Sequence, residues 1–492
     1  MSRRRTTKST ANTKAPNDGT AWGHLSDADL LKQVAAELAR RRVARGALDL
    51  DAIESFSEGS QQDFGQETLS ATVAALGPED SSPKPCPKCG VPVPVKTHNR
   101  VRHVLTLAGE FRLSRNYHYC RRCSAGFYPR DLELKLPAEG EVSDAMERRI
   151  LDFGINDTFE SSAERWSIHY RHSISSNLVR RVVDRVGVRC EAARELALQR
   201  ACNPAPAEPV PALVVASDGS MLLTREDAWR EAKVAVVAHL TPGRDGAPHE
   251  VSSPRFAAIL GGKVEFSSAV AAALAAERAD EVPLVAWLGD GAPSNWTLAS
   301  ELCPFAIQIL DVIHALQHGN DCGKALLGEG DAALPLWAAR IEQLLAASNV
   351  DLLVRELLDC LPFTTTDAHL GALDDLIGYY RTNEHRMQYR RFRELGLPIG
   401  SGIVESAHRH VLQARMKRAG QRWGLVRGRR MARLRAAYRT AGPRRFHRAL
   451  REAHFVQARP PPQRPLPNGP RRVNRTYTLG RGSPINRRNA SI

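Results

Sequence analysis

The stretch VPLVAWLGDGA at residues 282–292, together with PALVVASDG at residues 211–219, decides the expected fold. In each stretch an apolar run rich in β-branched residues stops at an Asp-Gly pair. Such a run predicts a buried strand, and the glycine permits a sharp turn after it. We therefore expect Asp218 and Asp290 at the ends of two buried strands.

A third acidic residue, Glu405, lies in LPIGSGIVES (397–406), where a glycine-rich turn opens a long predicted helix. Helical spacing predicts an apolar stripe on one side of this helix, formed by Val404, Ala407, Val411 and Ala414. The opposite side is predicted to carry Glu405, Arg409, Leu412 and Met416. Carboxylates from two strand ends and one helix can converge on hard divalent cations, and such a site suits phosphodiester chemistry. Taken singly, an Asp before Gly is also a common turn residue, and a Glu in a first helical turn is a common dipole partner.

The pattern around these acids predicts an α/β domain over residues 208–440. Three antiparallel-type strands (PALVVASDG, WREAKVAVVAHL and HEVSSPRFAAIL) precede a crossover helix, VEFSSAVAAALAAERA, and two further strands, VPLVAWLGDGA and FAIQILDVIHA. This is the element order of an RNase H-like fold. Residues from about 316 to 392 have a helical period, which predicts an α-helical insertion between the second and third acids.

Four cysteines in two CxxC pairs precede this domain. Cys86 and Cys89 are separated from Cys120 and Cys123 by 30 residues that alternate like a β-hairpin with a turn at Ala108-Gly109. Each pair offers two thiolates from one tight turn, so residues 85–137 are predicted to form a zinc-ribbon-like module with a structural Zn²⁺. The alternative is that these cysteines are reduced, buried residues that bind nothing.

Residues 138–201 have the pattern of a helix-turn-helix. Two short helical segments are followed by the Ser-started segment SISSNLVRRVVDRVG, with apolar positions at Leu178, Val179, Val182, Val183 and Val186. Its polar side carries three cations that could reach DNA, Arg180, Arg181 and Arg185. A three-helix packing module with no DNA contact is the alternative.

The remaining segments are expected to lie outside these modules. Residues 1–20 form a basic, disordered N-terminus, and residues 21–84 form a helical region with a polar linker. Residues 441–492 form a basic tail, disordered in part because its Pro- and Arg-rich sequence cannot bury a core.

The charge is uneven along the chain. The net charge is +15, yet the segment from Ala414 to the C-terminus alone has 22 Arg plus Lys and one acidic residue, Glu452. Such a segment favours contact with phosphate backbones at low sequence preference, although it could instead serve solubility. No apolar run reaches the length of a spanning helix, and no amphipathic stretch there predicts membrane binding. Paired cysteines fit a reducing compartment, so we expect the cytoplasm, with association to the nucleoid.

Three strings resemble the DDE transposases of bacterial insertion sequences, most closely the group of Kra-type insertion elements, which are related to Mutator-like transposases. They are GDGA (289–292), LDVIH (310–314) with a further histidine, and GLPIGSGIVESAHRHVLQARMKRAGQRW (396–423). The resemblance covers roughly residues 85–440. It implies an RNase H-like domain that cleaves and transfers DNA strands with Mg²⁺, and a catalytic triad of Asp218, Asp290 and Glu405.

The resemblance also assigns further residues. Asp218 and Asp290 would share one Mg²⁺, and Glu405 would help to hold a second. Asp311 and His314 match a (C/D)xxH signature, so His314 could orient a scissile phosphate, or it could be a satisfied histidine at a strand-to-helix junction. Cationic and stacking groups after the third acid could hold terminal-repeat DNA, or they could form a solvated helix end. These residues are Arg415, Lys417, Arg418, Arg422 and Trp423, and Arg409 on the Glu405 helix is added to them.

The resulting prediction is a transposase that binds the terminal inverted repeats of an element and joins them to target DNA. Pairing two ends requires a homo-oligomer on the double-stranded DNA. Two alternatives stay open, which are a domesticated, catalytically silent DNA-binding protein and an RNase H-like nuclease without strand transfer.

Overall fold

The computed structural model describes residues 25–46, 49–136, 140–170, 172–208, 210–241, 250–364 and 366–458. The chain divides into two compact units, Met1–Arg149 and Ile150–Ile492. The expected disorder at residues 1–20 lies outside the described residues, as does the part of the expected tail (441–492) from residue 459 onward. The first part of that tail instead forms a helix, Pro443–Ala458, with Phe446 and Leu450 buried. No helix in the described ranges is long and apolar enough to cross a membrane.

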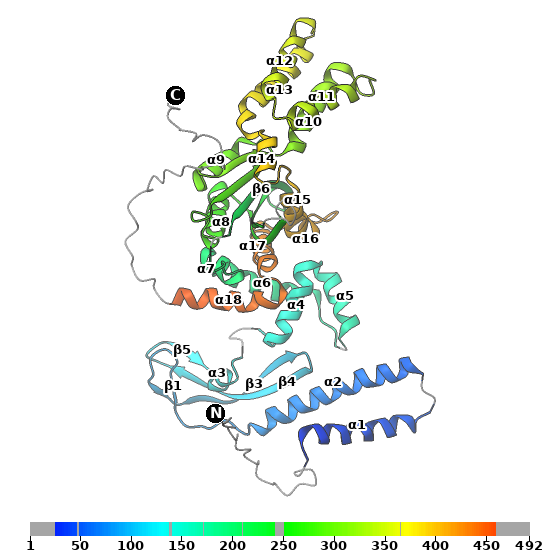
Figure 1. Ribbon diagram of the computed structural model, residues 1–492. Helices are drawn as coiled ribbons and strands as arrows, with labels where there is room; N and C mark the ends of the chain where they lie inside the picture. Colours follow the sequence, from blue (N-terminus) through cyan, green and yellow to red (C-terminus); the bar gives the residue numbers. More distant parts are fainter. Residues whose placement is uncertain are drawn as a thin grey trace, which may run out of the picture. The chain divides into compact units, whose positions relative to one another are not determined.

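The first unit combines two helices with small antiparallel sheets (Figure 1). Its elements are α1 (Asp27–Val43), α2 (Leu50–Ala75), β1 (Lys84–Pro85), β2 (Pro92–Val93), β3 (Val95–Thr106), β4 (Gly109–Cys120), β5 (Ala125–Phe127), α3 (Pro129–Glu133) and the start of α4 (Asp144–Asn156). The predicted hairpin is confirmed, since β3 and β4 pair antiparallel up to Thr106 and Gly109. Gly109 has a φ of 129°, a conformation that favours glycine at this turn.

The second unit is a mixed α/β structure. After the end of α4, its elements are α5 (Phe159–His169), α6 (Ser176–Ala192), α7 (Glu195–Cys202), β6 (Ala212–Leu223), β7 (Trp229–Thr241), β8 (Glu250–Leu260), α8 (Lys263–Ala276), β9 (Leu284–Gly289), α9 (Pro293–Leu302), β10 (Ile307–Leu310), α10 (Val312–Leu327), α11 (Leu334–Ala346), α12 (Val350–Cys360), η2 (Leu361–Phe363), α13 (Asp367–Asn383), η3 (Glu384–Arg386), α14 (Tyr389–Glu394), α15 (Gly402–Ala407), the π-helical η4 (His408–Gln413), α16 (Ala414–Met416), α17 (Leu425–Ala441) and α18 (Pro443–Ala458).

Five strands form the central sheet in the order β10-β9-β6-β7-β8. The strands β6, β7 and β8 pair antiparallel, whereas β9 and β10 run parallel to β6. The predicted order of three antiparallel strands, a crossover helix and two further strands is therefore confirmed. One detail differs, because β6 continues beyond Asp218 to Leu223 by pairing with β7 alone. Asp218 thus ends the buried part of the strand, not the strand itself.

The helix α17 covers the free edge of the sheet. The edge strand β8 donates the N–H of Phe256 to Thr440 Oγ1 at 2.9 Å, and Arg429 Nε donates to the carbonyl of Leu260 at 3.0 Å. Satisfying main-chain groups of an edge strand removes a template for pairing with other chains. The C-terminal helices therefore belong to the same core as the acidic strands.

The helices predicted as a helix-turn-helix form where expected. Ser175 caps α6 by accepting the N–H of Leu178 at 3.1 Å, and the predicted apolar positions of α6 are buried. The polar side of α6 is partly occupied by α17, since Asp184 pairs with Arg427 at 3.0 Å and Glu191 with Arg430 at 2.8 Å. This helix therefore packs within the second unit and is held there by ion pairs.

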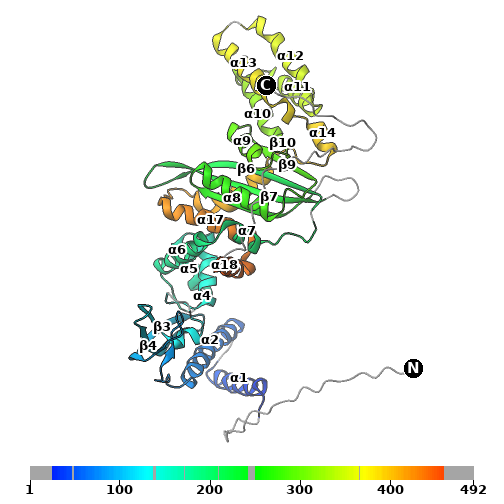
Figure 2. The same cartoon turned by 90° about the vertical axis from the view of Figure 1, so that its left-hand side faces the viewer.

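The chain between β10 and residue 397 is helical, in agreement with the predicted insertion. The helices α10 to α13 form a bundle that extends from one end of the sheet in both views (Figures 1 and 2). Tyr380 is buried in this bundle and donates from its hydroxyl to the carbonyl of Ala315 at 2.9 Å. The insertion thus begins next to the sheet and returns to it.

The helix that carries Glu405 changes its period within two turns. The π-helical η4 separates α15 from α16, and a π-turn rotates the side chains that follow it relative to an α-helix. As a result Ala414, expected in the apolar stripe, is exposed, whereas Leu412 and Met416, expected on the other side, are buried. The predicted division of this helix into two faces is therefore wrong after residue 411.

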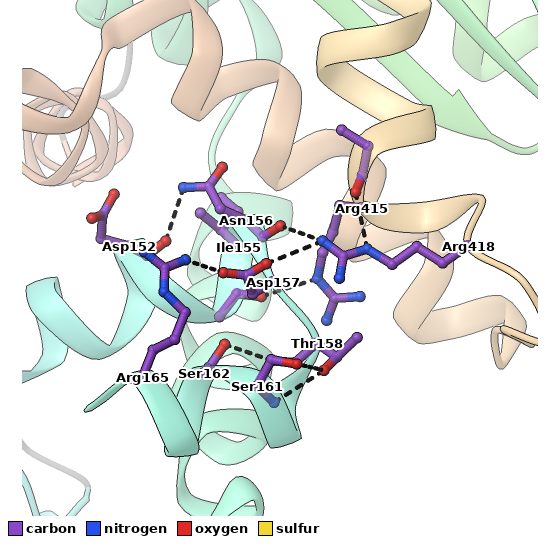
Figure 3. Close-up of polar contacts among 12 residues, drawn as sticks. Asp152, Ile155, Asn156, Asp157, Thr158, Ser161, Ser162, Arg165, Arg415 and Arg418 are labelled. Carbon is purple, nitrogen blue, oxygen red and sulfur yellow. Dashed lines mark hydrogen bonds and ion pairs between the residues drawn. The ribbon is translucent and has the colours of Figure 1, made fainter. Parts of the chain in front are cut away.

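Buried arginines hold this irregular helix in place. Arg435 of α17 donates to the carbonyls of Val411 and His410 in η4 and of Ile155 at the end of α4. Arg415 donates to Gly154 at 3.2 Å, and Arg418 to Asn156 at 3.1 Å. Helix-terminal carbonyls lack intrahelical partners, and cations near them are stabilising. Figure 3 shows Arg415 and Arg418 reaching the end of α4.

We predict that Arg435→Met destabilises the second unit by about 2–5 kcal/mol, because it removes three hydrogen bonds that the buried guanidinium donates to main-chain carbonyls. The matched control is Arg439→Met on the same helix, an exposed side chain whose loss should change stability by less than about 1 kcal/mol. Urea unfolding followed by circular dichroism measures both. Equal stability of the two variants would contradict the structural role of Arg435.

Candidate functional site

The parallel register brings Asp218 and Asp290 side by side. The pairing of β6 with β9 runs from Ala212 opposite Leu284 to Ala216 opposite Leu288. Two residues further along both strands are Asp218 and Asp290, and neighbouring strands lie about 4.8 Å apart. Both side chains line the same cavity. Burial raises the pKa of Asp218, and the nearby charge of Asp290 raises it further.

A third strand adds Asp311 to this row. The strands β10 and β9 pair with Leu310 opposite Gly289, and the N–H of Asp311 donates to the carbonyl of Gly289 at 2.8 Å. Asp311 is fully buried and caps α10 by accepting the N–H of Ile313 at 3.0 Å. Three adjacent parallel strands therefore each deliver an aspartate at the same side of the sheet, directly after β9 and β10 and within β6.

Asp311 holds His314 beside the two other aspartates. His314 Nδ1 lies 2.7 Å from Asp311 Oδ2, and the ring is partly exposed. The hydrogen bond to Asp311 raises the pKa of His314, and the charges of Asp290 and Asp218 raise it further. Burial alone raises the pKa of Asp311, but the hydrogen bonds from His314 and Ser401 outweigh burial and lower this pKa. The pair therefore favours a protonated imidazole next to the carboxylates.

Ser401 connects Glu405 to this group. The Ser401 hydroxyl donates to Asp311 Oδ2 at 2.6 Å and lies 3.4 Å from Glu405 Oε1. Glu405 is exposed in the first turn of α15, a helix that packs against β6 and β7. It does not line the cavity of Asp218 and Asp290. The structure thus brings the first two acids together directly and joins the third to them through Ser401 and Asp311.

Two residues beside the acids had not been singled out from the sequence for a role at the site. His408 is buried, and its Nε2 lies 3.3 Å from Asp218 Oδ2, although neither ring nitrogen is aligned for a hydrogen bond. Burial lowers the pKa of His408, an effect that Asp218 opposes. Asn295 donates to Asp290 Oδ1 at 2.8 Å and accepts from Ser217 Oγ at 2.7 Å. In the sequence, the position of His408 one helical turn after Glu405 could have indicated that it lies near the site.

The carboxylates of Asp218 and Asp290 are oxygen donors of the kind that Mg²⁺ accepts, and they face a polar cavity. In the described ranges, one group of three or more Cys, His, Asp or Glu residues could hold a metal ion, with its ligand atoms all within 4.8 Å of one another. That group is the four cysteines. The three predicted acids therefore do not form so tight a set here. The donor chemistry fits Mg²⁺ best at the pair Asp218 and Asp290.

The four cysteines form the predicted cluster and could bind zinc. The sulfurs of Cys86, Cys89, Cys120 and Cys123 all lie within 4.8 Å of one another. In the first knuckle the N–H of Gly90 donates to the carbonyl of Cys86 at 2.9 Å, with Gly90 at a φ of 72°. The N–H of Lys88 lowers the pKa of Cys86 to about 7, which favours the thiolate that a metal requires. This arrangement matches a tetrahedral Cys₄ site.

The predicted DNA-binding cations are placed differently from one another. Arg415 is buried, 1% exposed, and its guanidinium lies 5.1 Å from the Trp423 ring, which is also buried. Neither residue is therefore at the surface as expected, because both pack inside the second unit. Arg418 is half-buried and pairs with Asp157 at 3.1 Å (Figure 3). Lys417 is exposed, and its Nζ lies 3.4 Å from Ser220 Oγ, two residues beyond Asp218.

The other predicted cations lie nearer the surface. Arg409 and Arg422 are exposed. On α6, Arg181 is exposed and Arg185 partly so, while Arg180 donates to Asn177 Oδ1 at 3.3 Å. Among these predicted cations, Lys417 thus contacts Ser220 on the strand that carries Asp218.

No family model and no curated protein sequence matches this chain. Among solved structures it is similar to the Drosophila P element transposase strand transfer complex, with a TM-score of 0.24 and 12% sequence identity. That similarity covers 57% of this chain and 65% of the other, which is less than two thirds of its length. A similarity at this level carries no conclusion about function.

We predict that the purified protein contains close to one zinc per chain and that the double variant Cys86→Ser and Cys120→Ser contains none. Each serine removes a thiolate ligand from one knuckle. Plasma emission spectrometry of the protein measures the metal. Cys360→Ser is the control, since Cys360 lies outside the cluster and donates to Glu356. Zinc retained by the double variant would contradict this assignment.

We predict that Asp311→Asn lowers the pKa of His314, because the carboxylate that stabilises the imidazolium is removed. The pKa is raised in the folded protein, so this pair stabilises the fold fully below the ordinary histidine value of 6.5 and loses that contribution as pH rises through the folded value. Carbon-13 labelled histidine spectra recorded over pH 5–9 measure the shift. An unchanged titration of His314 would show that Asp311 does not control it.

Proposed function

We propose that this chain is a DDE-type DNA transposase of the Kra-type insertion element group. In this proposal the mixed sheet is an RNase H-like catalytic domain with an α-helical insertion, and Asp218, Asp290 and Glu405 are its catalytic acids. The observation that carries the proposal is the parallel register of β6 and β9, because it aligns Asp218 with Asp290 on neighbouring segments.

Two features of the site support this chemistry. Asn295 donates to Asp290 and orients it, and the Ser401 hydroxyl lies between Asp311 and Glu405. Asp218 and Asp290 are the proposed ligands of one Mg²⁺, and Glu405 is the proposed ligand of a second. Two such ions about 3.5–4 Å apart would supply activation of a water or 3′-hydroxyl and stabilisation of the leaving oxygen.

His314 is proposed to contact the scissile phosphate. Asp311 binds its Nδ1, which orients the ring so that Nε2 is the nitrogen left for the substrate. The raised pKa of His314 favours the imidazolium, a suitable partner for a phosphate oxygen. This role agrees with its position beside Asp218 and Asp290.

The proposed partner is double-stranded DNA, both at the terminal inverted repeats and at the target. Lys417, Arg409 and Arg422 are exposed on the segment that follows the third acid. Arg180, Arg181 and Arg185 on α6 form a second proposed contact. Pairing two ends would require a homo-oligomer, and the site of action would be the nucleoid in the cytoplasm. The zinc-ribbon-like module is proposed to support end binding.

We predict that Asp290→Asn lowers Mg²⁺-dependent nicking at the element ends by more than about 100-fold, since even outer partners of metal ligands contribute about 10–100-fold. Binding to the same DNA should persist. The substrate is a labelled duplex made from the inverted repeats that flank the gene, resolved on denaturing gels. The control is Asp321→Asn, an exposed acid on α10.

Wild-type protein that binds the ends yet never nicks them with Mg²⁺ or Mn²⁺ would overturn the proposal. A nicking activity that persists in Asp290→Asn would also overturn it. Joining of the nicked ends to target DNA separates a transposase from a nuclease with the same catalytic residues.

A further inference from the structure

The cavity beside the acids also contains two lysines. It measures about 150 Å³, enough for several waters, and is lined by Asp218, Asp290, Lys233 and Lys263 among others. Lys233 lies on β7 directly opposite Gly219, the residue after Asp218. Lys263 is the first residue of α8. The cavity therefore combines carboxylates that suit a cation with ammonium groups that suit an anion.

Two helices begin at the same cavity. Lys263 follows Gly262, which has no side chain to cap α8, and the first residues of α9 also line the cavity through Ser294 and Asn295. The first N–H groups of a helix lack intrahelical partners and carry partial positive charge, so they favour a phosphate. At α9 the first residue is Pro293, which has no N–H, and the N–H of Ala292 already donates to Asp290 Oδ1 at 3.0 Å. The start of α8 is therefore the one that adds to the positive charge of the two lysines.

The two lysines are held differently. Lys263 Nζ lies 3.9 Å from Glu301, and both side chains are more than half exposed. Exposed ion pairs contribute little stability, so Lys263 can exchange this carboxylate for a phosphate oxygen without a large loss. Lys233 is only 22% exposed, and its Nζ lies 3.3 Å from Glu231 Oε2, another residue that lines the cavity.

Gly219 explains how Glu231 holds Lys233 near Asp218. A Cβ at Gly219 would fall 2.2 Å from Glu231 Oε1, so a larger residue would displace this carboxylate from its present position. Glu231 thus lies across the main chain next to Asp218 and keeps Lys233 on the cavity wall. The chain does not turn at this glycine, because Gly219 lies within β6.

We propose that Lys233 and Lys263 form a binding subsite for a DNA phosphodiester next to the proposed metal ligands. The inference rests on the proposed function and deepens it by identifying residues that position the substrate backbone. The subsite binds a phosphodiester through the negative charge of the phosphate, so binding does not depend on the base. It places the strand so that the adjoining phosphodiester lies over Asp218 and Asp290.

The test measures binding of the dinucleotide dTpdT to the full-length protein by saturation-transfer NMR, without a metal ion. The double variant Lys233→Gln and Lys263→Gln should weaken binding at least fivefold. Lys324→Gln is the matched control, since this lysine on α10 is 51% exposed and lies 4.0 Å from Asp321, much as Lys263 lies near Glu301. Thymidine, which lacks a phosphate, should not bind.

Three results would overturn the subsite. They are no binding of dTpdT to the wild type, equal binding by the double variant, and binding of thymidine as tight as that of dTpdT. In the nicking assay the double variant should raise KM for DNA severalfold while the Mg²⁺ concentration for half-maximal rate stays unchanged. If the wild type binds dTpdT through these lysines but never nicks DNA, the subsite stands and the proposed function falls.

Discussion

The parallel register of β6, β9 and β10 is the constraint on which the candidate site depends. It aligns Asp290 and Asp311, which directly follow β9 and β10, with Asp218 within β6. A shift of one residue in either pairing would turn one of these side chains to the other face of the sheet. The buried apolar runs before Asp218 and Asp290 resist such a shift, because it would move their side chains out of the core.

The three aspartates have different environments, and this separates their roles. Asp311 is fully buried and bonded to His314 and Ser401, so its carboxylate positions other groups. Asp218 and Asp290 face the cavity, where a cation and a phosphate can reach them. Asp311 thus supplies the support, while Asp218 and Asp290 supply the partly exposed carboxylates.

The arginines after Glu405 show that a basic composition does not by itself indicate a DNA-binding surface. Arg415 and Arg435 are buried and bind main-chain carbonyls at the end of α4 and in η4. Part of the positive charge near the third acid therefore stabilises the helix that carries Glu405. The exposed cations, such as Lys417, are the ones available for the proposed contact with DNA.

The sequence alone determined the strands and their order along the chain, the hairpin with its four cysteines, and Asp290 directly after a buried strand. These features follow from local periodicity, turn residues and spacing, which every segment carries in itself. Only the tertiary structure decided that Arg415 and Trp423 are buried, that η4 exposes Ala414, and that His408, Asn295, Lys233 and Lys263 lie beside Asp218 and Asp290. Burial and proximity depend on contacts between segments far apart in the chain, and no local pattern encodes those contacts.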